Sequence, residues 1–254
     1  MLSVPFIPIL ALLLAPVAAG TIPPADAAEI LEQSDVASRA PESFRARFRI
    51  TDLRETPEPM DVEVWRSGES KSLVRFLGPK ERGKYLLRLD GVSWFLAPGA
   101  RKPVKVSPAH RLRGSASLDD ILGIRYGRDY VIEGATETVE AGGGLVVFDL
   151  AAKGPHAPYP KVRYFVRRAT GRPVRAEHLL PSGKTSSVVE FLEWEEGSRP
   201  VVRRLVLTDR LRSGLRTEVT LLELEERKIP GGLFDLGDPT ERKKLEERSS
   251  EAGS

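Results

Sequence analysis

Residues 44–51 read Phe-Arg-Ala-Arg-Phe-Arg-Ile-Thr, and this stretch decides the fold class. Its apolar side chains stand at every second position, at Phe44, Ala46, Phe48 and Ile50, with arginine or threonine between them. Successive side chains of a β-strand point to opposite faces of a sheet, so this pattern predicts a strand with one buried and one solvated face. Such a strand requires neighbours that share the same apolar face.

Short apolar stretches separated by turn residues supply these neighbours. Asp90-Gly91, between Leu89 and Val92, predicts a tight hairpin. Helical patterns are too few for a parallel βαβ sheet. The sequence therefore predicts a mainly β fold built on one curved antiparallel sheet, with further strands near 60–67, 70–78, 83–90, 92–97, 101–107, 129–138, 144–152, 161–168, 173–180, 185–194, 201–210 and 215–227.

Two helical segments are predicted to cover the apolar face of this sheet. The first spans 25–40 and is closed by Pro41. The second spans 117–122, with Ser117 as its N-terminal cap. A second sheet, as in a sandwich, is the alternative cover. Under helices the apolar face either lines a cavity or is filled by side chains, and the pattern leaves both readings open.

Alternation within each strand predicts which apolar side chains form the concave surface of the sheet. In the cavity reading these side chains are the ligand-binding residues, and three residues of the 114–123 segment form its lid. The predicted cavity residues are Phe44, Phe48, Ile50, Val64, Leu87, Leu89, Trp94, Leu96, Val147, Val166 and Val206, and the lid residues are Leu118, Ile121 and Leu122.

Residues 1–19 are uncharged and end in the small residues Val17-Ala18-Ala19. Their apolar core is shorter than the roughly 20 residues that span a bilayer. This pattern predicts a secretory signal cleaved after Ala19, and an uncleaved amphipathic anchor is the alternative because no Lys or Arg precedes the core. A single domain is predicted over 25–236, and the charged residues 237–254 are predicted to form a flexible tail.

Few residues offer catalytic or metal-binding chemistry. The three histidines, His110, His156 and His178, lie far apart, and none has a partner at a local metal-ligand spacing. His178 shares a strand face with apolar residues, which is more typical of a core histidine than of a ligand. Asp119 and Asp120 are adjacent and cannot share a helix face. With no nucleophile or phosphate-loop motif, the sequence predicts no enzyme and no cofactor, and an envelope hydrolase without a recognisable motif is the remaining alternative.

The chain has a formal net charge of +3, a calculated pI of about 9.1 and no cysteine. Its basic residues are spread along the strands, whereas nucleic-acid binding calls for a basic stripe, so no nucleic-acid partner is expected. These basic residues are interpreted as part of a solvated outer face, and a contact with acidic lipid headgroups is the alternative interpretation.

Two stretches resemble a known family. The first runs through 82–87, 90–98, 101–102 and 113–120, and the second through 158–162, 171–177 and 182–184. Their order and spacing are similar to those of the outer-membrane lipoprotein-sorting proteins of the LolA/LolB-like superfamily. The resemblance implies a half-open antiparallel β-barrel lidded by helices, with a hydrophobic cavity for acyl chains and neither cofactor nor catalysis.

The same resemblance implies a function and a place in the cell. It implies a periplasmic carrier or chaperone whose cargo is an acylated lipoprotein or lipid, sorted to the outer membrane. The partners it implies are an inner-membrane transporter and an outer-membrane acceptor. The alternative function is a non-catalytic accessory subunit of an envelope lipid-export complex, with the cavity filled by side chains.

Overall fold

The computed structural model describes residues 20–38, 40–54, 56–100, 102–107, 110–140, 143–155, 157–197, 200–212 and 214–235. The predicted signal at 1–19, the predicted tail at 237–254 and His156 lie outside the described residues. The single domain over 25–236 stays a prediction.

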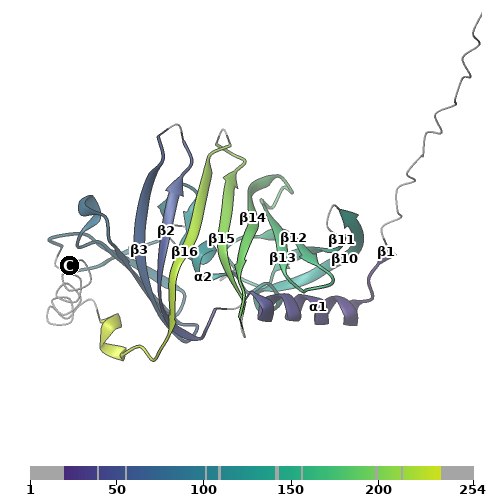
Figure 1. Ribbon diagram of the computed structural model, residues 1–254, viewed down its shortest axis with the longest axis horizontal. Coiled ribbons are helices and arrows are strands. Elements are labelled where there is room, and N and C mark those ends of the chain that lie inside the picture. Colours follow the sequence, from purple (N-terminus) through teal and green to yellow (C-terminus); the bar gives the residue numbers. More distant parts are fainter. Residues whose placement is uncertain are drawn as a thin grey trace, which may run out of the picture.

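One antiparallel sheet dominates the described chain (Figure 1). Its strands follow the order β1-β10-β11-β12-β13-β14-β15-β16-β2-β3-β4-β5-β6-β7, and β8 and β9 form a separate pair. The strands are β1 (Gly20–Thr21), β2 (Ser43–Asp52), β3 (Glu58–Ser67), β4 (Lys71–Phe76), β5 (Tyr85–Leu89), β6 (Val92–Leu96), β7 (Val104–Val106), β8 (Arg111–Arg113), β9 (Ala116–Ser117), β10 (Tyr130–Glu140), β11 (Gly143–Ala152), β12 (Lys161–Arg167), β13 (Pro173–Leu179), β14 (Thr185–Glu195), β15 (Val201–Asp209) and β16 (Arg216–Glu226).

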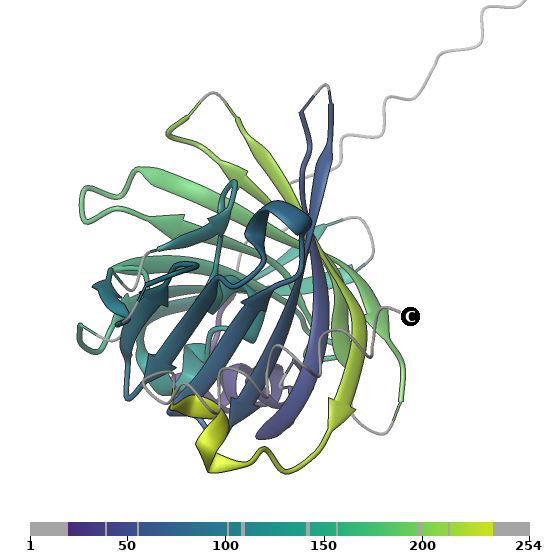
Figure 2. The same ribbon diagram turned by 90° about the vertical axis from the view of Figure 1, so that its left-hand side faces the viewer.

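The sheet curls strongly but does not close into a barrel, as Figure 2 shows. The predicted fold class, a half-open antiparallel β-barrel with an N-terminal helix and a short lid helix, is therefore confirmed. The helical elements are α1 (Pro24–Ala37), α2 (Leu118–Leu122) and α3 (Tyr126–Asp129), with short 3-10 turns η1 (Pro79–Glu81) and η2 (Gly231–Phe234).

Strand β2 behaves as its alternation predicts. Phe44, Ala46, Phe48 and Ile50 are all buried, and the arginines between them point to the other face. The Asp90-Gly91 hairpin is confirmed as well: Leu89 pairs with Val92, and both turn residues have positive φ, 48° and 79°. Two successive positive φ values define the type I′ turn, which matches the natural twist of a hairpin.

The helices also form where their signals predict them. Helix α1 begins with Pro24, which is favoured in the first turn, and ends at Ala37, slightly before the predicted end at residue 40. Its buried residues Ala27, Leu31 and Ser34 follow helical spacing and form one stripe. Helix α2 is capped by Ser117, as predicted. Helix α3, the β8–β9 pair and η2 carry weaker patterns and were not predicted.

The sheet has an apolar cluster on each face. The larger cluster lies on the concave side and joins α1, α2 and α3 to strands β2–β5 and β10–β16. The smaller cluster lies on the convex side, where Ile229, Leu233 and Phe234 cover Trp65, Leu73, Tyr85, Leu87 and Leu96 of strands β3–β6. The chain after β16 is thus folded back across the outside of the sheet.

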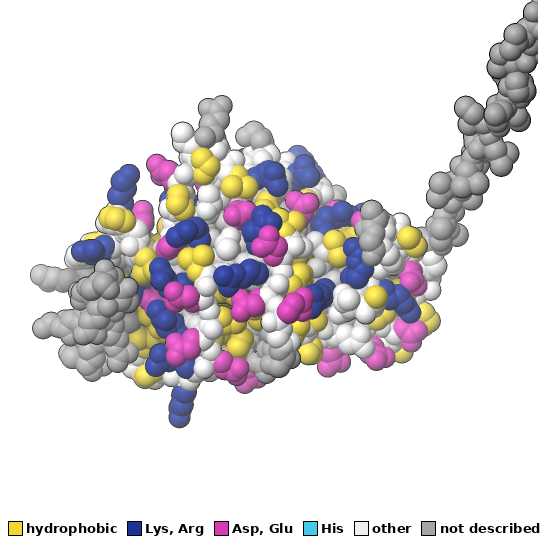
Figure 3. All heavy atoms as spheres, viewed as in Figure 1, with side chains coloured by type: hydrophobic (Ala, Val, Ile, Leu, Met, Phe, Trp, Pro, Cys, Tyr) yellow, Lys and Arg dark blue, Asp and Glu magenta, His cyan; other side chains and the backbone are white. Residues whose placement is uncertain are grey.

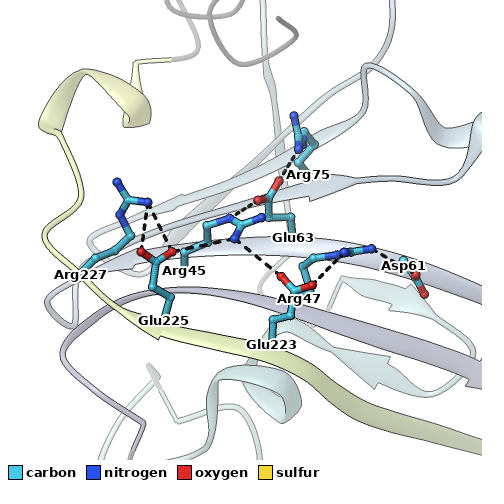
Figure 4. Close-up of polar contacts among 8 residues, drawn as sticks. All are labelled: Arg45, Arg47, Asp61, Glu63, Arg75, Glu223, Glu225 and Arg227. Atoms are coloured by element: carbon cyan, nitrogen blue, oxygen red, sulfur yellow. Dashed lines mark hydrogen bonds and ion pairs between the residues drawn. The ribbon is translucent and has the colours of Figure 1, made fainter. Parts of the chain in front are cut away.

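Beside the smaller cluster, the convex face carries a ladder of opposite charges (Figure 4). Glu63 on β3 is 2% exposed and forms ion pairs with Arg45 and Arg75 on either side. Next to this group, Nη1 of Arg47 on β2 lies 3.0 Å from Oε1 of Glu223 on β16. The outer surface accordingly shows basic and acidic side chains intermixed rather than gathered by sign (Figure 3).

Candidate functional site

A cavity lies between the concave face of the sheet and the helices that cover it. Its volume is about 110 Å³. Most of its wall is apolar, and the apolar lining comes from four regions: Ala40, Pro41, Phe44 and Phe48; Ile121, Leu122, Ile124 and Tyr126; Tyr164, Pro173, Val189 and Phe191; and Val201, Val202, Leu205, Val219, Leu221 and Leu224.

The cavity occupies one end of the half-barrel. Its lining on β2, β15 and β16 runs from the end of the sheet where Phe44, Val201 and Leu224 lie as far as Phe48, Leu205 and Val219. Charged side chains, among them Glu42, Glu69 and Arg203, stand in the same wall. An apolar interior with charged groups in its wall suits an amphiphile better than a purely polar ligand.

Helix α2 forms the cover over one side of the cavity. Leu118 is 1% exposed and belongs to the concave core, while Ile121 and Leu122 face the cavity. The end of this helix is tied to the sheet, because Nη1 of Arg66 donates to the carbonyl oxygen of Leu122 at 3.3 Å. The predicted lid residues therefore lie over the concave face, and their gating role stays a prediction.

Asp120 anchors the start of the same helix. Its Oδ2 accepts hydrogen bonds from the Ser117 backbone N–H at 2.9 Å and from the Ser117 hydroxyl at 2.6 Å. Its Oδ1 accepts a hydrogen bond from the hydroxyl of Tyr159 at 3.2 Å. Burial raises the pKa of Asp120 to about 6, because desolvation outweighs the stabilising hydrogen bonds. One buried carboxylate thus joins α2 to the wall of the half-barrel.

His178 lies directly behind this contact. Its ring stacks on Tyr159 with centroids 3.5 Å apart, and its Nδ1 lies 3.0 Å from the Ser187 hydroxyl. The residue is fully buried, and desolvation lowers the pKa of its imidazole to about 3. These contacts confirm the interpretation of His178 as a core histidine.

A second carboxylate holds the other covering helices together. Asp35 on α1 accepts hydrogen bonds from the backbone N–H groups of Tyr126 and Gly127, at 3.0 and 2.8 Å. Burial is the main cause that raises the pKa of Asp35 to about 6. Asp35 lines the cavity, so both anchors of the cover reach its wall.

Five of the predicted cavity residues point to the concave side. Phe44 and Phe48 line the cavity itself, whereas Ile50, Val64 and Val166 belong to the concave core around it. The ligand-binding role of all five stays a prediction.

The other six predicted cavity residues lie on the convex side, so their predicted placement is wrong. Leu87 and Leu96 belong to the convex cluster, Leu89 packs against it, and Trp94 pairs with Leu87 across β5 and β6. Val147 and Val206 alternate with inward residues of β11 and β15. Five of the six have an apolar neighbour on the other face of the same strand, so alternation alone does not tell their two faces apart. Leu89, between Arg88 and Asp90, lacks such a neighbour.

Several cavity residues were missed by the sequence analysis. Val189, Phe191, Leu205, Val219 and Leu221 line the cavity from β14, β15 and β16. Their register relates them to β2, since Val219 pairs with Ile50 and Leu221 with Phe48. Extending the β2 pattern across this pairing would have found the residues of β16.

The described part of the chain offers little chemistry of other kinds. It holds no group of three His, Asp or Glu side chains arranged to bind a metal ion. Among the same residues, no helix has the length and apolar character needed to cross a bilayer.

Solved structures with this architecture define its class. A LolA superfamily protein from Nitrosomonas europaea superposes with a TM-score of 0.73 at 22% identity, over 81% of this chain and 96% of that chain. An outer membrane lipoprotein-sorting protein domain from Vibrio parahaemolyticus gives a TM-score of 0.67 at 13% identity, over 82% of this chain and 95% of that chain. The fold is therefore LolA-like.

A family model described as an uncharacterized protein matches residues 68–237, which is about two thirds of the chain. The chain belongs to the family that this model describes. No curated protein matches the chain in sequence.

Proposed function

We propose that this protein is a periplasmic carrier or chaperone that binds the acyl chains of lipoproteins or lipids for sorting to the outer membrane. The observation that carries the proposal is the apolar cavity under α2 and α3. Each buried methylene contributes roughly 0.8 kcal/mol, so even part of an acyl chain supplies useful affinity. Its partners on this proposal are an inner-membrane transporter, an outer-membrane acceptor and the acylated cargo.

A carrier must also release its cargo, and the cover of the cavity suits this need. Helix α2 is short and is held by individual polar contacts, those of Asp120 and Arg66, as well as by apolar packing. Polar contacts to single groups are replaced by water at low cost when the cover moves. The lid therefore supports reversible access to the cavity.

A second candidate function is a non-catalytic accessory subunit of an envelope lipid-export complex. One observation favours it: the concave side next to the cavity is filled, with Ala116 at 0% and Leu118 at 1% exposure. An accessory subunit needs no cargo space, whereas a carrier needs the remaining cavity to open further.

The two functions differ in whether the protein takes up an acylated ligand. We expect an apolar fluorophore to bind at one site and an acylated peptide to displace it. The variant Phe191→Asp places a charge in the cavity wall and should weaken binding at least tenfold, because a carboxylate beside an acyl chain loses hydration. Leu192→Asp is the matched control, since Leu192 is 44% exposed and does not line the cavity.

Native mass spectrometry of detergent-free protein tests the same point without a probe. Co-purified lipid supports the carrier. A cooperatively folded wild-type protein that binds neither fluorophore nor acylated peptide at any concentration contradicts it and favours the accessory subunit.

A further inference from the structure

Two neighbouring hairpins end in tips that combine leucine with arginine. Figure 1 shows the hairpins β2–β3 and β15–β16 projecting on the side of the molecule away from α1. The two tips are joined, because the backbone N–H of Leu53 donates to the carbonyl of Arg216 at 2.9 Å. Leu53 is 38% exposed and Leu211 is 49% exposed, so two leucine side chains stand in solvent at adjacent tips.

The tip of β15–β16 is held in a defined shape. Asp209 is 2% exposed, and its Oδ1 accepts hydrogen bonds from the backbone N–H groups of Leu211 and Arg212, at 2.8 and 3.0 Å. The N–H of Asp209 donates to the carbonyl of Leu215 at 2.8 Å, and the N–H of Arg210 donates to that of Ser186 at 2.9 Å. A buried carboxylate therefore holds Leu211 in an outward position, where it does not fold back onto the sheet.

Positive charge surrounds these leucines. Arg54, Arg210, Arg212 and Arg216 are all exposed at the two tips. Arg54 pairs with Asp52, whereas no ion pair within the described part of the chain involves the other three. The acidic residues described at the tips all have a basic partner: Asp52 pairs with Arg54, the buried Asp209 lies 3.7 Å from Arg111, and the exposed Glu58 lies 3.2 Å from Arg113. The exposed charge of this end is therefore mainly basic.

We propose that the two hairpin tips, through their described residues 52–54, 209–212 and 214–216, form a docking surface for an anionic lipid bilayer. An exposed leucine inserts at the boundary between headgroups and acyl chains, and arginines beside it contact lipid phosphates. Isolated surface leucines are common and carry no meaning alone. Here two leucines are held outward at joined tips and flanked by arginines, which is the arrangement that an anionic bilayer complements.

The docking surface and the cavity lie at opposite ends of the same strands. Phe44 opens β2 beside the cavity, and Asp52 closes β2 at the tips. A protein attached through its tips therefore keeps the cavity end facing away from the bilayer. The proposal is separate from cargo binding, so either one can fail without the other.

Sedimentation with vesicles tests the docking surface. The purified chain should sediment with vesicles of phosphatidylcholine containing about one third phosphatidylglycerol, and not with phosphatidylcholine alone. The double variant Arg210→Glu, Arg212→Glu should lower the partition coefficient at least tenfold, given about fivefold for each arginine lost. Leu211→Ser should lower it severalfold without changing its dependence on salt.

The matched control is the double variant Arg163→Glu, Arg168→Glu, which makes the same change in net charge on the exposed side chains of β12 and its turn. It should keep most of the binding. If both double variants lost vesicle binding equally, the loss would come from the change in net charge and not from the tips, and the docking surface would be overturned. Absence of sedimentation with the anionic vesicles at low salt would also overturn it, and would leave an acidic protein surface as the partner to test.

Discussion

At the scale of single residues, Glu63 is a buried charge on the convex face that depends on its ion-pair partners. It is nearly inaccessible, and it neutralises Arg75, which is 7% exposed and lies over the ring of Trp65. Removing one partner of a buried ion pair leaves the other charge uncompensated in a poorly hydrated site. Glu63 therefore matters more for stability than the exposed rungs of the same ladder.

We expect Glu63→Gln to lower the free energy of unfolding by about 3–5 kcal/mol. Glu223→Gln is the control: that side chain is half exposed, and its loss should cost less than about 1 kcal/mol. Urea unfolding of both variants measures the difference. Equal small losses would show that Glu63 is better hydrated than its burial indicates.

His178 gives the protein a pH dependence with a defined sign. The folded protein keeps this imidazole neutral down to a pKa of about 3, whereas the unfolded chain protonates it near 6.5. Between these values the unfolded state binds more protons, so this group makes stability fall on acidification, by up to about 1.4 kcal/mol per pH unit. Asp35 and Asp120 act in the opposite direction, since their raised pKa values let the folded state bind protons more tightly up to pH 6.

Because these contributions oppose one another, the test is a difference between variants. We expect His178→Phe to lose less stability than the wild type when the pH falls from 6.5 to 4, whatever its stability at neutral pH. Ser187→Ala, which removes the hydrogen-bond partner but keeps the imidazole, should follow the wild-type slope. If the stability of His178→Phe and of the wild type fell equally with pH, that result would contradict the lowered pKa of His178.

At the scale of elements, the lid helix α2 depends on its cap. The Ser117 hydroxyl accepts from the backbone N–H of Asp120 at 3.4 Å and donates to the Asp120 carboxylate. We expect Ser117→Ala to destabilise the helix by about 1 kcal/mol and to speed hydrogen exchange over 114–123 about fivefold. Bound acylated peptide should slow exchange over the same residues in the wild type.

The control for this variant comes from the same segment. Ser115 is also buried, and its hydroxyl has no hydrogen-bond partner within the described part of the chain. Ser115→Ala should therefore leave exchange over 114–123 unchanged. Unchanged exchange in Ser117→Ala as well would mean that apolar packing, and not the cap, holds the lid.

Strand β2 and its partners show how far the sequence predicts this molecule. The arginines of β2 mark one face as solvated, so the inward direction of Phe44 and Phe48 follows from the sequence alone. In β5 and β6 both faces are apolar, with Leu86 beside Leu87 and Trp94 beside Phe95. The convex cluster is the reason, because η2 buries a second face of these strands. That contact joins residues far apart in the sequence and leaves no local signal.

The apolar concave face was predictable, whereas a cavity beneath the helices and its exact lining were not. Strands, turns and the Ser117 cap have short-range patterns, and these were confirmed. The anchors Asp35 and Asp120 bind backbone groups and Tyr159 at positions that only the folded chain brings together. No spacing rule identifies a carboxylate whose partners lie on other elements.

At the scale of the whole molecule, the sheet is stabilised from both sides. Residues 229–234 complete the convex cluster, and the helices complete the concave one. We expect a chain that ends at Lys228 to lose about 5 kcal/mol or more of stability, since it gives up the buried side chains of Ile229, Leu233 and Phe234. It should also bind an apolar dye on its uncovered convex face.

A chain that ends at Asp235 is the control for this truncation, because it keeps all three side chains. Thermal unfolding and dye binding of the two chains give the comparison. Equal stability would show that the convex cluster contributes little to the fold.

The strand order also sets the sequence of events in folding. Strands β2–β7 and β10–β16 are two meanders whose ladders join chain neighbours, and among the described strands only the pairing of β16 with β2 joins one meander to the other. Ile50 of β2 pairs with Val219 of β16, so this ladder cannot form until β16 is present. Non-local pairing is slow because the long intervening loop must first be closed at an entropic cost. The sheet of the nascent chain thus stays incomplete until the ribosome has made almost all of the strands. On the proposal of a periplasmic carrier, this delay would leave time for export in an unfolded form.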